Sequence, residues 1–239
     1  MNVVAETGEV TVDALALRFD VSAETIRRDL AQLAETGALQ KVHGGARRLC
    51  LHAEGSYGER MTQDAGAKAG IAQKLTRLVA PGVTLFIDTG TTTLTCAEAL
   101  TAVDGLTVIT DSLHVAQALG RSRNRVFLLG GEFSADSAET VGPLVIEQIG
   151  RFQADHAVLT VSALDTVAGA TDSDFGEAQV SRAMMDNARN TVMVAGGTKL
   201  GRKAAFRVCR LDEIDVLVCD ETPPDAFIAA LDAAQVDWR

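Results

Sequence analysis

The spacing of apolar residues near the start of the chain predicts two short helices. The first predicted helix has apolar residues at intervals of three and four, which form one buried face: Val12, Leu15, Ala16 and Phe19. Ser22 is a favourable N-cap for the second helix, and Gly37 is placed to end it. The buried face of the second helix holds Ile26, Leu30 and Leu33.

A turn signal follows the second helix and predicts a small hairpin. His43, Gly44 and Gly45 separate the segment 39–42 from Ala46, Arg47 and Arg48. Two helices joined by a tight turn and followed by a hairpin are the pattern of a winged helix-turn-helix. We assign this domain to residues 1–50 and a linker, marked by Gly55, Ser56 and Gly58, to residues 51–60.

The rest of the chain, residues 61–239, alternates between short apolar runs and helical patterns. The strand-like runs are 83–87, 106–109, 126–129, 157–161, 191–195 and 216–219. The helical patterns lie around 92–100, 112–119, 143–150, 177–188 and 224–233. This alternation predicts an α/β domain with a Rossmann-like, largely parallel sheet that helices cover on both faces.

Composition and charge narrow the classes of function. Apolar residues make up 47% of the 239 residues and charged residues 23%, which is typical of a globular protein. The net charge of −10 excludes a general polyanion binder, so contact with nucleic acid has to be local. The four cysteines lack the spacing of a zinc or redox site, so we expect no metal and no cofactor. Without a signal peptide or a membrane-spanning run, we expect a cytoplasmic protein.

The second helix and the hairpin carry the candidate DNA contacts. Ile26 and Leu30 are buried, so the helix turns polar residues outward: Ser22, Thr25, Arg27 and Arg28. The wing adds Lys41, His43, Gly44, Gly45 and Arg47. A solvated face with an ion pair from Glu24 to Arg28 also fits the helix alone. The basic wing beside it favours DNA.

One polar segment follows the run 83–87 and opens the next predicted helix: Asp88, Thr89, Gly90, Thr91, Thr92 and Thr93. Glycine lets the backbone approach an anion, and the N–H groups of a helix N-terminus point at it. Asp88 is placed to accept a hydrogen bond from a sugar hydroxyl. A capped turn without a ligand also fits, but ligands gather at the carboxyl ends of parallel strands, which favours a ligand.

Three further positions have two interpretations each. Lys199 is placed to hold a phosphate or carboxylate, or it belongs to a solvated basic loop. Asp174 and Glu177 have the spacing of a capping box and also suit recognition of sugar hydroxyls. Gly130 lines the same sheet edge or forms only a turn.

Several segments together resemble the signature of the DeoR-type bacterial transcriptional repressors. They are VSAETIRRDL at 21–30, HGGA at 43–46, LFIDTGTTT at 85–93, TDSL at 110–113, LGGE at 129–132 and Thr198-Lys199. The resemblance covers nearly the whole chain, and the combination of TIRRDL with HGGA is highly specific. The segments DFGE at 174–177 and Gly201-Arg202 most resemble the glycerol-3-phosphate repressor branch.

The resemblance implies a winged-helix repressor with a sugar-phosphate-sensing domain similar in fold to the sugar-phosphate isomerases. It implies that Asp88–Thr93 and Lys199 hold a phosphorylated sugar or polyol, with Asp174 and Glu177 nearby. The expected partners are operator DNA and a second copy of the chain, in a homodimer or homotetramer. The alternative is a sugar-phosphate isomerase, in which Glu177 or Asp174 acts as base and Lys199 clamps the phosphate.

Overall fold

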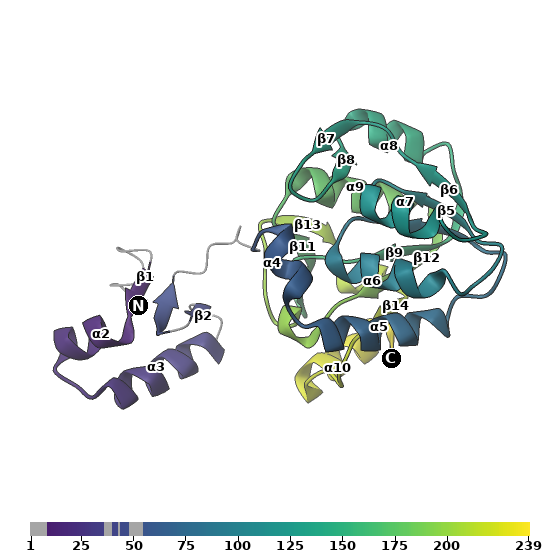
Figure 1. Ribbon diagram of the computed structural model, residues 1–239. Coiled ribbons are helices and arrows are strands. Elements are labelled where there is room, and N and C mark those ends of the chain that lie inside the picture. The colour runs from purple at the N-terminus through teal and green to yellow at the C-terminus, as the bar shows by residue number, and fades with distance from the viewer. Residues whose placement is uncertain (1–8, 36–39, 43, 48–54) are drawn as a thin grey trace. The chain divides into compact units, whose positions relative to one another are not determined.

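The computed structural model describes residues 9–35, 40–42, 44–47 and 55–239. The chain divides into two compact units, residues 1–51 and residues 52–239 (Figure 1). Each unit has its own apolar core, and each is described separately below.

The first unit is a winged helix-turn-helix, as the sequence predicts. Its helices are α2 (Val12–Phe19) and α3 (Ala23–Glu35). The hydroxyl of Thr11 caps α2 by accepting a hydrogen bond from Ala14 N (3.2 Å). An antiparallel sheet has the order β1-β3-β2, with strands β1 (Glu9–Thr11), β2 (Gln40–Val42) and β3 (Gly45–Arg47).

The core of the first unit is small. Its buried apolar residues are Val10, Val12, Leu15, Ile26, Leu30 and Ala46. The prediction was wrong for Phe19, whose side chain is 55% exposed although its spacing assigns it to the buried face of α2. Phe19 is the last residue of the helix, and the described residues leave more than half of it exposed.

The second unit is built on a parallel seven-stranded sheet in the order β15-β14-β12-β9-β4-β5-β6. Its strands are β4 (Thr84–Ile87), β5 (Thr107–Thr110), β6 (Arg125–Leu128), β9 (Ala154–Leu159), β12 (Ala188–Val194), β14 (Val216–Val218) and β15 (Asp237–Trp238). All six apolar runs predicted as strands are confirmed, and β15 adds a short edge strand.

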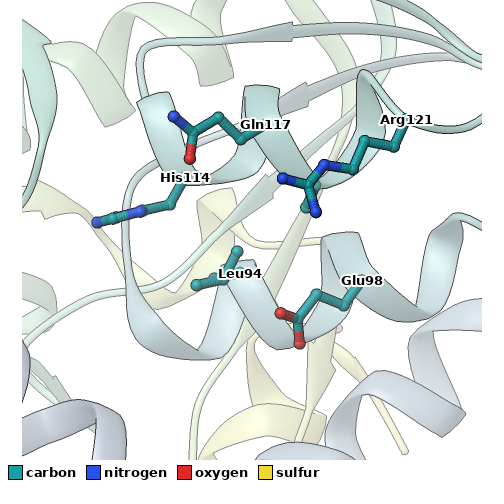
Figure 2. Close-up of a pocket in the computed structure, with 6 residues that line it drawn as sticks. Leu94, Glu98, His114, Gln117 and Arg121 are labelled. Carbon is teal, nitrogen blue, oxygen red and sulfur yellow. The ribbon is translucent and has the colours of Figure 1, made fainter.

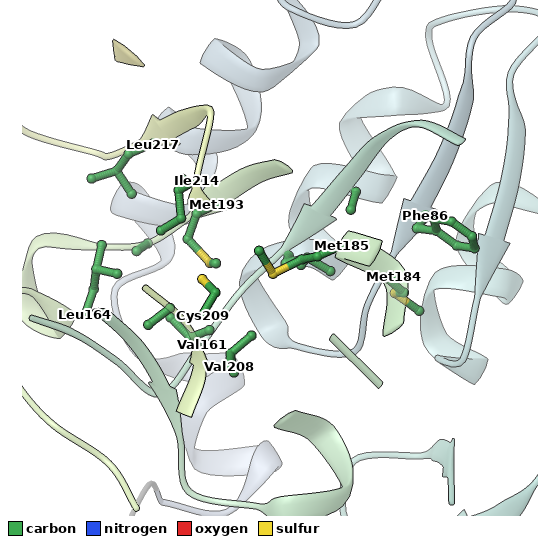
Figure 3. Close-up of a cluster of buried hydrophobic side chains, with 14 of the residues drawn as sticks. Phe86, Val161, Leu164, Met184, Met185, Met193, Val208, Cys209, Ile214 and Leu217 are labelled. Carbon is green, nitrogen blue, oxygen red and sulfur yellow. The ribbon is translucent and has the colours of Figure 1, made fainter. Parts of the chain in front are cut away.

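Helices cover both faces of this sheet, because alternate residues of each strand point to opposite faces. Leu85 and Ile87 of β4 pack into a core with α5 (Ala65–Thr76), α6 (Thr91–Leu100) and α7 (Leu113–Leu119). Phe86 joins the opposite core. That core includes α8 (Pro143–Ile149), α9 (Phe175–Asp186) and α10 (Asp225–Ala233). Figure 3 shows part of it, including Phe86 and Met184.

Two small antiparallel sheets accompany the main sheet and were not predicted. One is the hairpin of β7 (Glu132–Ser134) and β8 (Glu139–Val141). The other has the order β10-β11-β13, with β10 (Ala163–Asp165), β11 (Gly169–Asp172) and β13 (Phe206–Cys209). The segments of these strands, EFS, ETV, ALD, GATD and FRVC, mix polar and apolar residues and form no continuous apolar run, unlike most strands of the main sheet.

The linker assigned to residues 51–60 is too long at its carboxyl end. Residues 57–60 instead form the start of helix α4 (Tyr57–Thr62). Ser56 and Glu59 make a capping box, in which Glu59 N donates to Ser56 Oγ (3.3 Å) and Ser56 N donates to Glu59 Oε2 (2.9 Å). This reciprocal cap explains how a helix begins directly after Gly55.

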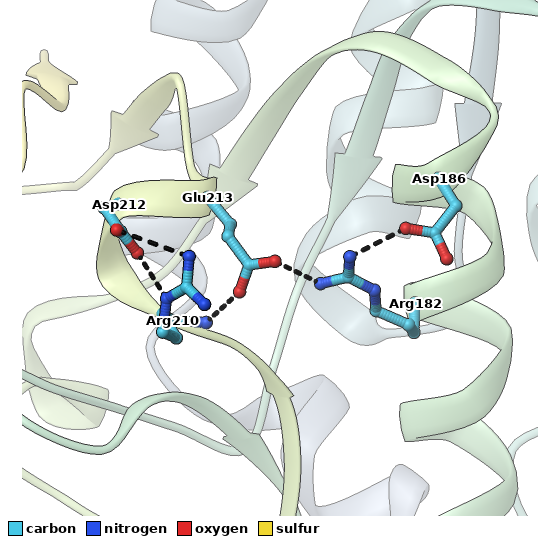
Figure 4. A network of polar contacts seen from close by, with 5 residues as sticks. All are labelled: Arg182, Asp186, Arg210, Asp212 and Glu213. Carbon is cyan, nitrogen blue, oxygen red and sulfur yellow. Dashed lines mark hydrogen bonds and ion pairs between the residues drawn. The ribbon is translucent and has the colours of Figure 1, made fainter.

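A polar network fixes α9 to the short 3-10 helix η2 (Leu211–Glu213) that precedes β14 (Figure 4). The guanidinium of Arg182 contacts Glu213 (2.7 Å) and Asp186 (2.8 Å). Glu213 also accepts a hydrogen bond from Arg210 N (2.7 Å), and the Arg210 side chain pairs with Asp212. Because α9 begins beside the candidate site, the contacts of Arg182 also hold the helix in its orientation toward that site.

The cysteines that the structure describes, Cys96, Cys209 and Cys219, are buried thiols. Burial raises the pKa of each thiol to about 12, so they behave as small apolar residues. Cys50 lies outside the described residues.

In the described part of the chain, no helix combines the length and apolarity needed to cross a bilayer, and no cluster of His, Cys, Asp or Glu is suited to a metal ion.

Truncating Leu30 is expected to destabilise the first unit selectively. Leu30 is 4% exposed in a small core, so Leu30→Ala should cost about 2–5 kcal/mol. Hydrogen exchange of peptides covering α2 and α3 should become faster, and exchange in β4 should not change. Leu17→Ala is the matched control, because Leu17 is 86% exposed. Equal exchange in the two variants would contradict the assigned core.

Candidate functional site

The exposed face of α3 carries the four predicted DNA-contacting residues of this helix. Ser22 caps α3, because Thr25 N donates to Ser22 Oγ (3.1 Å). Thr25, Arg27 and Arg28 are exposed, whereas Ile26 and Leu30 are buried. Glu24 pairs with Arg27 (3.2 Å), and not with Arg28 as the spacing suggested. This exposed pair is weak and leaves both arginines accessible.

The wing follows the predicted hairpin. Lys41 lies on β2 opposite Ala46, and Arg47 lies on β3 opposite Gln40. Gly45 packs against β1 so closely that a Cβ at this position would lie 2.1 Å from Val10 O. Gly44 accepts a hydrogen bond from Val12 N (2.8 Å), which ties the wing to α2. His43 lies outside the described residues.

The candidate ligand site lies where the sheet reverses its order. Strands β4, β5 and β6 follow one another in one direction, and β9 pairs with the other side of β4. The carboxyl ends of β4 and β9 are joined by Asp88, whose Oδ2 accepts a hydrogen bond from Thr160 N (2.8 Å). Such a reversal is the position at which parallel sheets bind ligands.

The turn after β4 packs tightly against Thr160. Gly90 has φ +155°, and a Cβ there would lie 2.4 Å from the Thr160 methyl group. Thr89 is buried, and its hydroxyl has no hydrogen-bond partner among the described residues. The turn therefore requires glycine and holds a buried hydroxyl beside the N-terminus of α6.

The three threonines that open α6 are all buried and have different contacts. Thr93 donates to Gly90 O (3.2 Å) and is fully buried, so its hydroxyl stabilises the turn. The backbone of Thr91 accepts from the Thr95 hydroxyl (3.0 Å). Together with Thr92, Thr91 forms the first turn of a ten-residue helix, where unpaired N–H groups favour an anion.

Lys199 is held close to the end of β9. It closes the 3-10 helix η1 (Gly197–Lys199), and its Nζ donates to Val161 O (2.5 Å). Burial lowers the pKa of Lys68, and the charges of Lys199 and Arg60 lower it further, although Asp64 opposes this shift. Three cationic side chains from α4, α5 and η1 are therefore within electrostatic range of one another.

Lys68 and Arg60 were missed in the sequence analysis. Lys68 is 9% exposed and donates from its Nζ to Arg60 O. The signal for Lys68 was a single charged residue among the small residues of AGAKAGIA. Arg60 was assigned to the linker, and its guanidinium instead lies 5.6 Å from the centre of the Tyr57 ring, which stacks on His114 (5.1 Å).

Asp174 and Glu177 have different surroundings although they share one helical turn. Asp174 is exposed and caps α9, since Glu177 N donates to its Oδ1 (3.0 Å). The Glu177 side chain forms a hydrogen bond with Glu139. Burial, together with the charges of Glu139 and Asp172, raises the pKa of Glu177 to about 9, although Arg60 opposes this shift. Glu177 therefore interacts with the buried carboxyl groups of Glu139 and Asp172.

Two other features of the second unit are Gly130 and a shallow groove. Gly130 lies shortly after β6, and both of its backbone polar groups bind the side chain of Gln148. Gly130 N donates to Gln148 Oε1 (3.2 Å), and Gln148 Nε2 donates to Gly130 O (2.6 Å). A shallow groove of about 200 Å³ lies between α6 and α7 (Figure 2). It is lined by Leu94, Glu98, His114, Gln117, Ala118 and Arg121, so it includes none of the predicted ligand residues.

Known proteins match both units. Residues 1–50 match the DeoR-like helix-turn-helix domain, and residues 63–221 match the DeoR C terminal sensor domain. The chain is 33% identical to the HTH-type transcriptional repressor CsqR of Escherichia coli (strain K12), over 98% of this chain and 90% of that protein. It is 31% identical to the glycerol-3-phosphate regulon repressor of the same strain, over 97% and 92%.

Among solved structures, the similarity is distant. Ribose 5-phosphate isomerase A of Methanocaldococcus jannaschii aligns with 56% of this chain and 53% of its own, at 14% identity and a TM-score of 0.42. A similarity at this TM-score carries no information about activity. The family models and the nearly full-length relatives agree with the helix-turn-helix and sheet described above, and the chain therefore belongs to the DeoR family of transcription regulators.

Proposed function

We propose that this protein is a transcriptional repressor that binds operator DNA through its first unit. A phosphorylated sugar or polyol, bound by the second unit, releases it from DNA. The observation that carries this proposal is the extent of the match, since relatives named as repressors align with 97–98% of the chain. The match therefore includes both the exposed arginines of α3 and the buried threonine site.

DNA binding follows from the geometry of α3. A helix of 13 residues with Thr25, Arg27 and Arg28 exposed fits the major groove, where arginine reads guanine edges. The wing would contact the phosphate backbone through Lys41, His43 and Arg47. Because the net charge is −10, this local basic surface has to supply the attraction. Operators with two-fold symmetry favour a homodimer or homotetramer. The proposed place of action is the cytoplasm, where the operator DNA of a bacterial cell lies.

The effector would bind at the switch between β4 and β9. The N-terminus of α6 and the cations Arg60, Lys68 and Lys199 suit a phosphate group. Lys68 holds the backbone of Arg60 in α4, the first helix described after the segment that joins the units. A phosphate that draws these cations together would shift α4, which suggests how binding favours a state with lower DNA affinity.

The alternative function, isomerisation of a sugar phosphate, fits the site poorly. The carboxylate of Asp174 is engaged as the cap of α9. Glu177 has its pKa raised to about 9, mainly by burial, so at neutral pH it is protonated and unable to accept a proton. With relatives named as repressors and a match to the DeoR-like helix-turn-helix domain, the chain is a regulator and not an enzyme.

Removing either exposed arginine of α3 should weaken operator binding. Arg27→Ala and Arg28→Ala are each expected to raise the Kd for the protein's own upstream DNA by about ten-fold, because each loses a base or phosphate contact. Fluorescence anisotropy of labelled upstream DNA at several salt concentrations measures this Kd. Arg151→Ala, at a residue 71% exposed in the second unit, is the control and should bind like wild type. Unchanged affinity in all three variants would exclude α3 as the reading helix.

Removing the positive charge of Lys68 or Lys199 should impair release from DNA. Lys199→Met and Lys68→Met keep most of the side-chain volume and lose the charge. Each should raise about ten-fold the concentration of phosphate ester that dissociates the DNA complex, without changing DNA affinity in its absence. The anisotropy assay uses glycerol 3-phosphate and a panel of sugar phosphates. Lys203→Met is the matched control, since Lys203 is 54% exposed. Normal release from both variants would contradict the assigned phosphate site.

A further inference from the structure

Two buried carboxyl groups near the switch point have no role in the function proposed above. Asp111 follows β5 and is 1% exposed, and Glu139 begins β8 and is 2% exposed. Buried acidic residues are rare unless they are paired or bind something. Neither residue was predicted as a ligand contact.

The β7–β8 hairpin brings these two residues together. Leu113 N donates to Ala138 O (2.9 Å), and Thr140 N donates to Asp111 O (3.0 Å). Ser112 and Glu139 form an isolated antiparallel bridge. The hairpin is thus fixed by backbone hydrogen bonds to the turn after β5, and Glu139 is placed beside Asp111.

The two carboxyl groups interact with residues of the effector site. Burial raises the pKa of Asp88 well above its ordinary value, and Asp111 raises it further. Burial also raises the pKa of Asp111 and of Glu139 to about 8 each. Glu139 forms its hydrogen bond with Glu177 of α9. Near neutral pH Asp111 and Glu139 are therefore mostly protonated, so each of these two carboxyls carries both a donor and an acceptor.

Several buried polar atoms around these carboxyls have unused hydrogen-bonding capacity. Asp88 Oδ1, Asp111 Oδ1 and the hydroxyls of Thr89 and Thr160 have no partner in the part of the chain that the structure describes. All four side chains are more than nine-tenths buried, and Thr160 donates its own N–H to Asp88. Buried polar groups without partners are costly, so these atoms are suited to a ligand that supplies hydrogen bonds.

The chemistry of these atoms favours hydroxyl groups over a cation. Protonated carboxyls and threonine hydroxyls both donate and accept, as alcohol hydroxyls do. A cationic ligand would add charge near Arg60, Lys68 and Lys199, of which Arg60 is within electrostatic range of Glu177. No described cluster is suited to a metal ion.

We propose that Asp111 and Glu139, together with Asp88 and Thr160, bind the hydroxyl-bearing end of the phosphorylated effector. The β7–β8 hairpin then takes part in selecting which polyol or sugar phosphate releases the repressor. This inference rests on the proposed function, because it assumes that a phosphate ester occupies the same site.

Binding of matched esters to the full-length variants tests the proposal. Asp111→Leu, Glu139→Met and Thr160→Val remove the hydrogen-bonding atoms of the proposed contacts, and Glu132→Gln, at an exposed residue of the same hairpin, is the control. Isothermal titration calorimetry measures the affinity of each protein for glycerol 3-phosphate, glucose 6-phosphate, propyl phosphate and inorganic phosphate. Propyl phosphate is included because its carbon chain lacks hydroxyl groups. Wild type and the control should prefer one hydroxylated ester over propyl phosphate by at least about ten-fold. The three variants should reduce this preference to about three-fold or less and keep the affinity for inorganic phosphate.

Other results separate the two proposals. If wild type binds no ester, the proposed effector and this inference both fail. If wild type binds esters and the preference survives in the variants, only the assignment of Asp111 and Glu139 fails. Tighter binding of phosphoethanolamine than of either hydroxylated ester would overturn the choice of hydroxyl over cation. Circular dichroism and DNA affinity identify any variant that fails to fold, and the remaining variants then decide the outcome.

Discussion

The hydrogen bond between Asp88 and Thr160 is the contact on which the candidate site depends. The chain leaves β4 toward β5 on one side and leaves β9 toward β12 on the other, so the connections after these two paired strands lead in opposite directions. Asp88 links the ends of the two strands by accepting a hydrogen bond from Thr160 N (2.8 Å). Gly90 then packs against the Thr160 methyl group and sets the start of α6. The parallel sheet delivers the turns after β4, β5 and β9 to the same edge.

The hydrophobic pattern was sufficient for the main sheet because most of its strands lie in continuous apolar runs, such as LFI within β4 and VLV in β14. It was insufficient where a short strand mixes polar and apolar residues, as in the β7–β8 hairpin (EFS and ETV), which brings Glu139 to the site. Helix α4 is a different case. Gly55, Ser56 and Gly58 look like a linker, but Ser56 and Glu59 carry the spacing of a capping box, a local signal that outweighs the glycines.

The composition of the site was harder to predict than its position. Asp88 and the threonines follow one apolar run, so the chain itself places them at a strand end. Lys68, Asp111 and Glu139 come from separate elements, and only the folded topology shows that all three are buried, with Lys68 near Arg60 and Lys199 and with Glu139 near Asp111. Local sequence also gave the wrong outcome for Phe19, because a periodic position is buried only when another element covers it.

Burying Asp111 and Glu139 fully, and Glu177 in part, has a cost that depends on pH. Their folded pKa values, about 8, 8 and 9, exceed those of exposed carboxyls, so the folded state binds more protons than the unfolded state between about pH 4 and these values. The free energy of unfolding therefore falls as the pH rises through that window. A fold under selection for stability alone would replace these groups by apolar ones. Their presence at the switch point is more consistent with a site that gains stability when a ligand supplies hydrogen bonds. Because Glu177 also faces Arg60 of α4, that gain would be felt by the helix that follows the DNA-binding unit in the chain.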